Sequence, residues 1–195
     1  MILYLIRHGK TKCNEERLYC GKTDIDLSNG GIKELNDLKK KISYPICENN
    51  YTSGAKRANQ TFEILYPGSL YTANKEFFEY DFGDFELKSY EDLKEDINYI
   101  NWITDESQNI KCPNGESKRD FKDRLENAFQ NFIKDLEKNN IKEALILCHG
   151  GVIGTLLQNF YSDEKDFYSY QPSFGRGYKV RVNTETLAIE VLEEI

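Results

Sequence analysis

The two histidines are the residues of this chain best suited to chemistry, because each follows an apolar run and precedes a glycine. His8 comes after Ile2–Ile6 and Arg7, and His149 comes directly after Ala144–Cys148. A neutral imidazole is a usable nucleophile and proton acceptor near pH 7. One histidine in such a place would be interpreted as an ordinary loop residue, but the same context occurring twice favours a shared site.

The residues around the histidines predict how they meet. Short continuous apolar runs bounded by glycine are typical of central parallel strands. Ligands of an open parallel sheet bind beyond the carboxyl ends of its strands, which is where both histidines would lie. We therefore expect His8 and His149 to come together despite their separation in the sequence.

Two arginines would give this site affinity for a phosphoryl group. Arg7 adjoins His8, and Arg57 follows the strand candidate that ends at Thr52-Ser53, in the first turn of the next helix and near the positive end of its dipole. A solvated surface arginine is the simpler interpretation of Arg57 alone. However, guanidinium groups bind phosphate oxygens bidentately, so the arginines and histidines together predict a pocket for a tetrahedral dianion.

A proton donor for the leaving oxygen is expected in the segment Phe77–Glu86. This segment carries four carboxylates among aromatic residues, namely Glu79, Asp81, Asp84 and Glu86. An apolar setting raises the pKa of a carboxyl group and keeps a fraction of it protonated near neutrality. Composition does not choose among the four, and most of them would be ordinary solvated carboxylates.

The strands and helices that position these residues follow from hydrophobic periodicity. Further strands are predicted at Asn50–Thr52, Leu70–Thr72, Phe78–Phe82, Tyr178–Val182 and Leu187–Leu192, the last two as a terminal hairpin. The alternation of strands with helices predicts an α/β fold of three layers (α/β/α), with a mostly parallel central sheet and helices on both faces. We expect a single domain over residues 1–195.

The helical patterns lie between these strands. Ser28 caps a helix burying Ile32, Leu35, Leu38 and Ile42, a second begins after Ser53 and buries Ala58, Phe62 and Leu65, and a capping box at Ser89 leads to Leu93, Ile97 and Ile100. The most regular helix is Ser117–Leu136, whose apolar face consists of Phe121, Leu125, Ala128, Phe129, Phe132, Ile133 and Leu136. Val152–Phe160 forms the last helix, and the loop Thr104–Gly115 is long enough to help cover a site.

Composition argues against several classes of partner and site. The 195 residues include Lys+Arg 26 and Asp+Glu 33, and a net charge of −7 disfavours binding to nucleic acid or to an anionic membrane. Only two histidines, and five cysteines without a Cys-x-x-Cys pair, argue against a metal site and a disulfide framework. Cys148 is interpreted as a buried structural residue. With no signal-peptide core and no bilayer-spanning run, a cytoplasmic location is expected.

The motifs that carry the site residues resemble the histidine phosphatase superfamily, which includes the cofactor-dependent phosphoglycerate mutases. The similar segments are Leu5–Thr11, Asn14 with Gly21, Leu27–Gly31, Ser53–Thr61, Glu79–Glu86 and Cys148–Val152, in the family's order and spacing over most of the chain. The chain has Lys10, Phe85 and Leu87 where the family more often has glutamate, tryptophan and glycine. Lys10 would change the charge at the mouth of the pocket and so bears on substrate preference.

The resemblance implies a phosphoglycerate mutase-like fold and a role for each site residue. It makes His8 the nucleophile that becomes phosphohistidine, and Glu79 the acid that protonates the leaving oxygen and then activates water. The implied clamp on the phosphoryl oxygens consists of Arg7, Arg57 and His149, and the other implied substrate contacts are Asn14, Cys20, Gly21 and the Gly150 amide. Because preorganised positive groups stabilise the charge of the transition state, no metal ion and no cofactor is expected.

Two segments are similar to the bacterial α-ribazole phosphatases, enzymes of cobalamin assembly. They are Asn14–Gly21, which resembles a Leu-Tyr-x-Gly loop, and Cys112–Ser117 with Phe121 and Arg124. This similarity favours a phosphomonoesterase that acts on α-ribazole 5′-phosphate, a small phosphate monoester, as a monomer or homodimer. A pocket for a nucleoside-like base would be lined by Tyr19, Phe77, Phe78 and Tyr90, which could equally belong to the core.

Two alternatives remain open. One is a phosphoglycerate mutase or a broad-specificity sugar-phosphate phosphatase, but the longer middle insertion and extended tail expected of the mutases are missing, so we expect hydrolysis. The other is a non-catalytic phosphate-binding or scaffold protein. The intact set of proposed reacting groups makes this last interpretation the least favoured.

Overall fold

The two apolar runs pair with each other at the centre of one sheet. In the computed structural model, which describes residues 1–161 and 167–195, β1 (Ile2–Arg7) and β4 (Glu143–Cys148) run parallel, with Arg7 opposite Cys148. Both strands are buried along most of their length, as is typical of strands covered on two faces. The parallel pairing places the residues that follow each strand at the same edge of the sheet.

The other strands extend the sheet on both sides in the order β3-β2-β4-β1-β5-β6. β2 (Asn50–Thr52) pairs in parallel with β4, and β3 (Thr72–Ala73) pairs in parallel with β2. β5 (Gly177–Val182) is antiparallel to β1 and forms the predicted terminal hairpin with β6 (Ile189–Glu194). The sheet is therefore mixed, with the predicted parallel part at the strands that carry the site.

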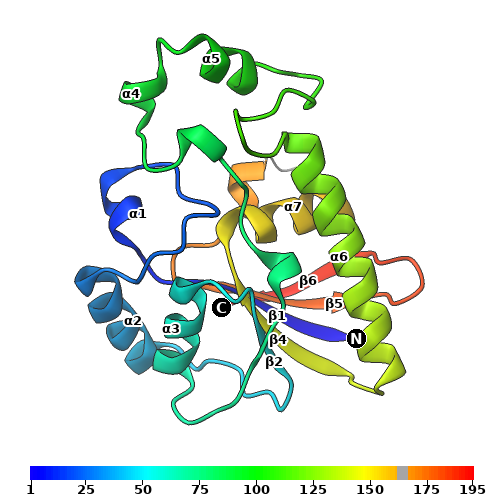
Figure 1. Cartoon of the computed structure of the whole chain (residues 1–195). Coiled ribbons are helices and arrows are strands. Elements are labelled where there is room, and N and C mark those ends of the chain that lie inside the picture. Colours follow the sequence, from blue (N-terminus) through cyan, green and yellow to red (C-terminus); the bar gives the residue numbers. More distant parts are fainter. Residues whose placement is uncertain (162–166) are drawn as a thin grey trace.

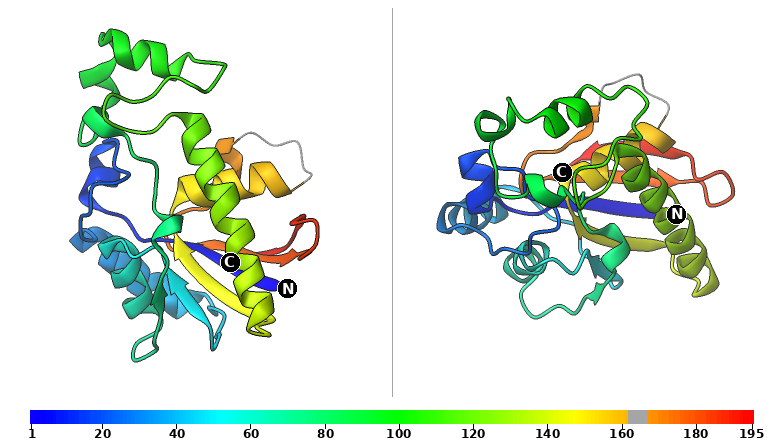
Figure 2. Two further views of the ribbon diagram at one scale, coloured as in Figure 1. Left: turned by 45° about the vertical axis from the view of Figure 1, so that its right-hand side comes forward. Right: turned by 45° about the horizontal axis from the view of Figure 1, so that its top comes forward.

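Helices cover both faces of the sheet, so the predicted three layers are confirmed (Figures 1 and 2). The long helices are α2 (Asn29–Lys41), α3 (Lys56–Leu65), α6 (Lys118–Lys138) and α7 (Gly150–Phe160). Leu3 and Leu5 of β1 pack in the core formed with α6 and α7, whereas Tyr4 and Ile6 pack in the core formed with α2 and α3. This alternation is the period-2 pattern of a strand between two layers.

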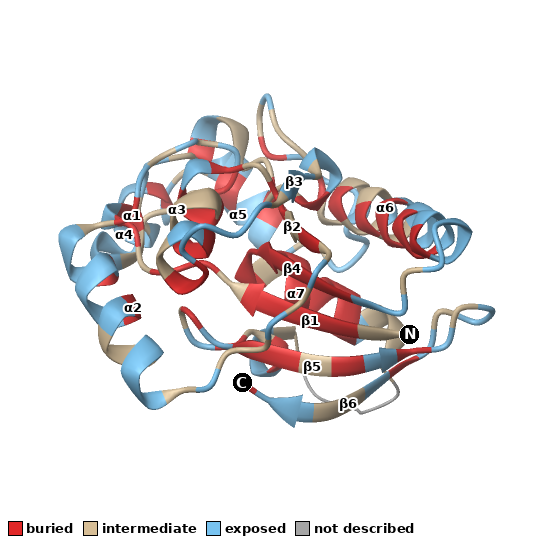
Figure 3. Cartoon of the chain, turned by 90° about the horizontal axis from the view of Figure 1, so that it is seen from below, coloured by how far each residue is buried: buried red, intermediate tan, exposed pale blue. Residues whose placement is uncertain are grey.

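The remaining elements are short: α1 (Lys12–Glu16), η1 (Lys75–Phe77), η2 (Gly83–Phe85), α4 (Tyr90–Leu93), α5 (Ile97–Ile103) and η3 (Phe167–Tyr170). α4 and α5 form an excursion at the top of Figure 1, outside the layered body. Burial is concentrated in the sheet and on the inner faces of the helices (Figure 3). Within the described residues, no helix has both the length and the apolar character that crossing a bilayer would require.

The residues at which the helices begin agree well with those predicted from the sequence. Ser28, Ser89 and Ser117 are the N-caps of α2, α4 and α6, and the last two form capping boxes with Asp92 and Asp120. All seven residues of the predicted apolar face of α6 are buried. Local capping chemistry and a strong 3.6-residue period are both encoded in neighbouring residues, which explains the agreement.

Two helical faces were predicted only in part, since Leu35 and Leu93 are buried as expected but three isoleucines are exposed. Ile32 of α2 is 37% exposed, and Ile97 and Ile100 of α5 are 63% and 37% exposed. The expected helix after Ser89 is broken, because Asp96 caps a new helix and thereby changes which face points inward. Tyr99 and Trp102 are the residues of α5 that are buried.

The segment Phe78–Phe82 is not the strand that its alternating pattern predicts. It lies between η1 and η2, and its main-chain groups bond to side chains of other segments instead of to a neighbouring strand. The predicted strand at Leu70–Thr72 is displaced along the chain, since β3 covers only Thr72–Ala73. These segments are short, so periodicity alone carries little information about their partners.

The five cysteines differ in their burial. All five are free, and Cys148 is fully buried within β4. Burial raises the pKa of the Cys148 thiol, so the thiol stays protonated near neutrality. This supports the structural interpretation of Cys148.

The cap of α6 provides a test of how strongly this helix depends on its first turn. Ser117 is only 2% exposed, and its hydroxyl accepts from the Asp120 amide at 3.0 Å. We expect Ser117→Ala to lower the free energy of unfolding in urea by about 1 kcal/mol. Ser43→Ala, at an exposed position outside the helices, should change it by less than about 0.5 kcal/mol. Equal effects of the two substitutions would contradict the importance of this cap.

Candidate active site

The pairing of β1 with β4 brings the two histidines together. The backbone N–H of His8 donates to the Cys148 carbonyl at 3.0 Å, which continues the parallel ladder by one residue. The two imidazole rings lie edge to face with their centroids 5.1 Å apart. His8 is 5% exposed and His149 is fully buried. The meeting predicted from the repeated sequence context is therefore observed.

His8 is held in the form that a nucleophile requires. Its Nδ1 lies 2.6 Å from the Gly9 carbonyl, which can only accept, so Nδ1 carries the hydrogen and Nε2 keeps its lone pair. Burial lowers the pKa of His8 well below 6.5, and the nearby charges of Arg57 and Arg7 lower it further. The ring is thus neutral near pH 7.

Hydrogen bonds connect the backbone next to His8 to α3, the helix that carries Arg57. The Gly9 N–H donates to Thr61 Oγ1 at 2.9 Å, and that hydroxyl donates to the Arg57 carbonyl at 2.6 Å. Thr61 is fully buried in α3. The loop after β1 and the first turn of α3 are therefore held in one arrangement.

His149 is oriented by a serine that the sequence analysis did not include among the site residues. His149 Nε2 lies 2.8 Å from Ser53 Oγ, and both residues are fully buried. Burial and the Arg57 charge lower the pKa of His149 well below 6.5. Its Nδ1 is buried and has no hydrogen-bond partner among the described residues, so its hydrogen-bonding capacity is unused there. The signal that pointed to Ser53 was its place directly after β2, at the same sheet edge.

The guanidinium groups of both predicted arginines are fixed by main-chain carbonyls. Arg57, which is 1% exposed, donates from Nη2 to the Gly21 carbonyl at 2.7 Å and from Nη1 to the Thr23 carbonyl at 3.0 Å. Arg7 donates from Nη1 to the Pro172 carbonyl at 2.8 Å, and its buried Nε has no hydrogen-bond partner in the part of the chain that the structure describes. Each guanidinium has five N–H donors, so donors remain for an anion on both residues.

Glu79 is the carboxylate that reaches the histidines' side of the sheet. Its Oε2 accepts from the Gly151 N–H at 2.9 Å, at the start of α7, and its Oε1 accepts from the Tyr80 N–H at 3.0 Å. Burial raises the pKa of Glu79, against the opposing effect of these two N–H donors and of Arg57 and Arg7. A carboxyl group with a raised pKa is suited to give and take a proton near neutrality.

The other three carboxylates of this segment are engaged elsewhere. Asp81 pairs with Lys22 at 2.7 Å, Asp84 accepts from the Asn114 side chain at 3.0 Å, and Glu86 accepts from the backbone N–H groups of Gly21 and Lys22. Of the four carboxylates, Glu79 is thus the one that the tertiary structure brings to the start of α7, two residues after His149, and its role as the acid stays a prediction.

The two glycines at the start of α7 allow the charged groups to approach the helix. A Cβ at Gly150 would lie 2.8 Å from Arg7 Cζ, and a Cβ at Gly151 would collide with the Glu79 carboxylate. His149 is the N-cap residue, so the Gly150 amide lies at the positive end of the helix dipole. The start of α7 therefore presents backbone groups to the site, with no side chain at these two positions.

The residues of the loop from Asn14 to Gly21 have structural partners of their own. Asn14 Oδ1 accepts from the Thr11 backbone N–H and hydroxyl at 2.9 Å each. The Gly21 N–H donates to the Glu86 carboxylate, and the Gly21 carbonyl accepts a hydrogen bond from Arg57. Burial raises the pKa of the Cys20 thiol to about 12. Substrate contacts of Asn14, Cys20 and Gly21 stay a prediction.

The aromatic residues that could line a pocket for a nucleoside-like base lie in different environments. Phe77 is fully buried in the core, and Tyr90 is 58% exposed on α4. Phe78 is half-buried, and its ring centroid lies 5.7 Å from that of His149. The loop Thr104–Gly115 packs against the acid segment, where the Pro113 carbonyl accepts from the Asp84 N–H at 2.8 Å.

An opening borders the site on the side of Arg7. It has a volume of about 320 Å³ and is lined by Arg7, Lys10, Glu34, Gln171, Pro172, Ser173 and Phe174. Lys10 forms an ion pair with Glu34 at 2.8 Å, and the Phe174 ring centroid lies 3.9 Å from Arg7 Cζ. The charge that Lys10 brings to the pocket mouth is therefore largely balanced by Glu34.

The comparison with protein families agrees with this geometry. The family model described as Histidine phosphatase superfamily (branch 1) matches residues 3–192. The chain belongs to the histidine phosphatase superfamily. Both histidines, Arg7, Arg57 and Glu79 lie in the segments through which the sequence resembles that superfamily.

Individual members of the superfamily are similar over most of the chain. An adenosylcobalamin/alpha-ribazole phosphatase of Salmonella typhimurium is 32% identical over 162 residues, which cover 80% of this chain and 78% of that protein. The alpha-ribazole phosphatase of Shigella flexneri has a TM-score of 0.82 and 27% identity, over 98% of this chain and 96% of that chain. A phosphoglycerate mutase of Thermus thermophilus has a TM-score of 0.72 and 26% identity, over 100% of this chain and 98% of that chain. The chain is thus a histidine phosphatase with a phosphoglycerate mutase-like fold.

The buried neutral histidines of this phosphatase predict a dependence of stability on pH. Below about pH 6.5 the unfolded chain binds protons at His8 and His149 that the folded chain does not, so the free energy of unfolding should fall as the pH is lowered from about 7.5 to about 5.5. Glu79 acts in the opposite direction, because its raised pKa lets the folded state bind a proton more readily. Urea unfolding at several pH values measures the combined effect of these three residues on the free energy of unfolding.

Variants separate the two contributions. His149→Gln should make the free energy of unfolding depend less on pH in this range, and Glu79→Gln should make it depend more. An unchanged slope in His149→Gln would show that this histidine is not held neutral in the folded state.

Proposed function

We propose that this histidine phosphatase hydrolyses phosphate monoesters through a phosphohistidine on His8, and that its substrate is α-ribazole 5′-phosphate. The observation that carries the first part is the state of His8. Its Nδ1–H is bound to the Gly9 carbonyl, its Nε2 lone pair is free, and two fixed arginines lie beside it. A neutral nucleophile beside fixed positive charge suits attack on a phosphoryl dianion.

In the first step His8 Nε2 attacks phosphorus and forms the P–N bond. The P–O bond to the ester oxygen breaks, and the oxygen leaves with the electron pair and takes a proton from Glu79. Arg7, Arg57 and the Nδ1 side of His149 hold the phosphoryl oxygens, with the Gly150 amide and Asn14 as further donors. These groups are already oriented by the protein, so they need little rearrangement as charge develops.

In the second step a water molecule attacks the phosphohistidine. Glu79, now a carboxylate, takes a proton from the water, the P–N bond breaks, and inorganic phosphate is released with His8 neutral again. One residue serves as acid and then as base, which requires a carboxyl pKa nearer to neutrality than that of a solvated glutamate. Burial moves the pKa of Glu79 in this direction.

The proposed substrate rests on the relatives and on the surroundings of the site. Proteins named as alpha-ribazole phosphatases are similar to this chain both in sequence and in structure. The half-buried Phe78 ring next to His149 offers an apolar surface to the alcohol part of an ester. A place in cobalamin assembly, a cytoplasmic location, and action as a monomer or homodimer without nucleic-acid or membrane partners complete the proposal.

Removal of the nucleophile tests the covalent intermediate. We expect His8→Ala to reduce kcat by at least about 10³-fold and to abolish phosphoenzyme formation, because no other side chain at the site presents an imidazole in this orientation. Phosphoenzyme is measured after a base quench, in which phosphohistidine survives. A His8→Ala protein that folds normally and turns over at the wild-type rate would refute the assignment.

A panel of phosphomonoesters tests the substrate. We expect α-ribazole 5′-phosphate to have a higher kcat/KM than sugar phosphates, phosphoserine and 3-phosphoglycerate, measured by phosphate release. Isomerisation of phosphoglycerate in the presence of bisphosphoglycerate, faster than any hydrolysis, would instead identify a mutase. Similar kcat/KM values for all esters would identify a broad-specificity phosphatase, and no turnover would leave phosphate binding without catalysis.

A further inference from the structure

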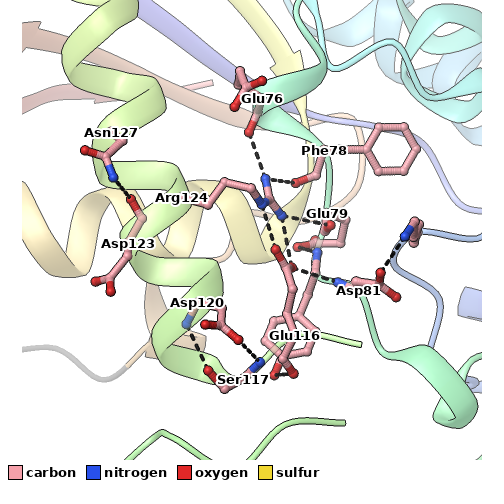
Figure 4. Close-up of polar contacts among 12 residues, drawn as sticks. Glu76, Phe78, Glu79, Asp81, Glu116, Ser117, Asp120, Asp123, Arg124 and Asn127 are labelled. Carbon is pink, nitrogen blue, oxygen red and sulfur yellow. Dashed lines mark hydrogen bonds and ion pairs between the residues drawn. The ribbon is translucent and has the colours of Figure 1, made fainter. Parts of the chain in front are cut away.

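Next to the backbone that carries Glu79, Arg124 and Glu116 form a bidentate ion pair (Figure 4). Arg124 Nε donates to Glu116 Oε1 at 2.8 Å, and Nη2 donates to Oε2 at 3.1 Å. Arg124 lies in the second turn of α6, and Glu116 directly precedes the cap residue of the same helix. Side-chain exposures of 26% and 20% place the pair partly inside the protein.

Arg124 also binds the main chain on the amino-terminal side of Glu79. Its Nη1 donates to the carbonyls of Glu76 at 2.8 Å and Phe78 at 3.2 Å, and its Nη2 donates to the carbonyl of Glu79 itself at 3.3 Å. These carbonyls lie outside any strand, so no ladder orders them. One guanidinium therefore fixes the backbone from which the Glu79 side chain extends.

Glu116 holds the carboxyl-terminal side of Glu79 in the same way. Its Oε2 accepts from the Asp81 N–H at 3.0 Å, and its own N–H donates to the Asp81 carbonyl at 2.9 Å. The Tyr80 hydroxyl donates to the Glu116 carbonyl at 2.8 Å. The backbone is thus held on both sides of Glu79, and both anchors belong to the start of α6.

We propose that Arg124, together with Glu116, is a positioning pair that sets the place of the Glu79 carboxyl group for proton transfer to the leaving oxygen. This inference rests on the proposed role of Glu79. Among the described residues, the hydrogen bonds of the Arg124 guanidinium go to main-chain carbonyls and to Glu116, so in this proposal it acts through Glu79 and not on the substrate. Its charge is paired with Glu116 and also helps to lower the pKa of His149, whereas its proposed effect on Glu79 is geometric.

The effect of a displaced Glu79 carboxyl group on the rate depends on how much the leaving oxygen needs a proton. An alkoxide leaves poorly without protonation, whereas p-nitrophenolate leaves readily as the anion, so a displaced acid should harm alkyl esters more than the aryl ester. A displacement of about 1 Å at a reacting group can cost on the order of 10²-fold in rate. A purely structural defect would lower the rates for both esters to the same extent.

The test compares the rates of the Arg124→Met variant and the wild type on two esters. These are p-nitrophenyl phosphate and the alkyl phosphate that the wild type hydrolyses fastest. The initial burst of released alcohol or phenol gives the rate of phosphoenzyme formation, which isolates the step that uses the acid. We expect this rate to fall about 10–100-fold for the alkyl ester and less than about 5-fold for the aryl ester, with KM changed by less than about 3-fold.

Three further variants make the result specific. Arg119→Met, at an exposed position on the same helix, should change neither rate. In a Glu79→Gln background, Arg124→Met should cause no further selective loss on the alkyl ester, because the group that it positions is gone. Glu116→Gln should reproduce the selectivity of Arg124→Met and serves as the test if that variant does not fold.

The outcomes distinguish this inference from the proposed function. Equal losses on the two esters, or an undiminished effect of Arg124→Met in the Glu79→Gln background, would overturn the positioning role while leaving the phosphatase assignment intact. A wild-type protein that hydrolyses neither ester would overturn both.

Discussion

The parallel register of β1 and β4 is the constraint on which the rest of the site depends. With Arg7 opposite Cys148, the next residue of each strand is a histidine, and the two rings lie 5.1 Å apart. A shift of one residue would turn every side chain of β1 to the opposite face and would separate the imidazoles. The apolar residues that bury the two strands therefore also align the reacting groups.

Main-chain groups balance the charge that this arrangement buries. Carbonyls hold Arg7, Arg57 and the Nδ1–H of His8, and backbone N–H groups hold the Glu79 carboxylate. Burying charged groups without such partners would be costly. Burial and the neighbouring arginine charges keep both histidines neutral near pH 7. Fixed dipoles and charges of this kind are what a phosphoryl transfer requires.

Glu79 is held by different contacts from those that position the histidines. Glu79 lies on irregular backbone, which the side chains of Arg124 and Glu116 and the first turn of α7 hold in place. A strand would have limited the side chain to one of two faces, whereas this arrangement lets the carboxylate reach the start of α7.

Much of this protein could be predicted from local sequence patterns: the central strands ending at histidine, the serine caps and the buried face of α6 are all carried by neighbouring residues. Other features depended on contacts between segments far apart in the chain. The exposure of Ile97, the irregular backbone at Phe78–Phe82, the choice of Glu79 over the other carboxylates and the role of Ser53 belong to this second group. Periodicity and capping reflect the geometry of a single element, whereas these features are decided by which distant groups compete for the same hydrogen bonds and the same buried space.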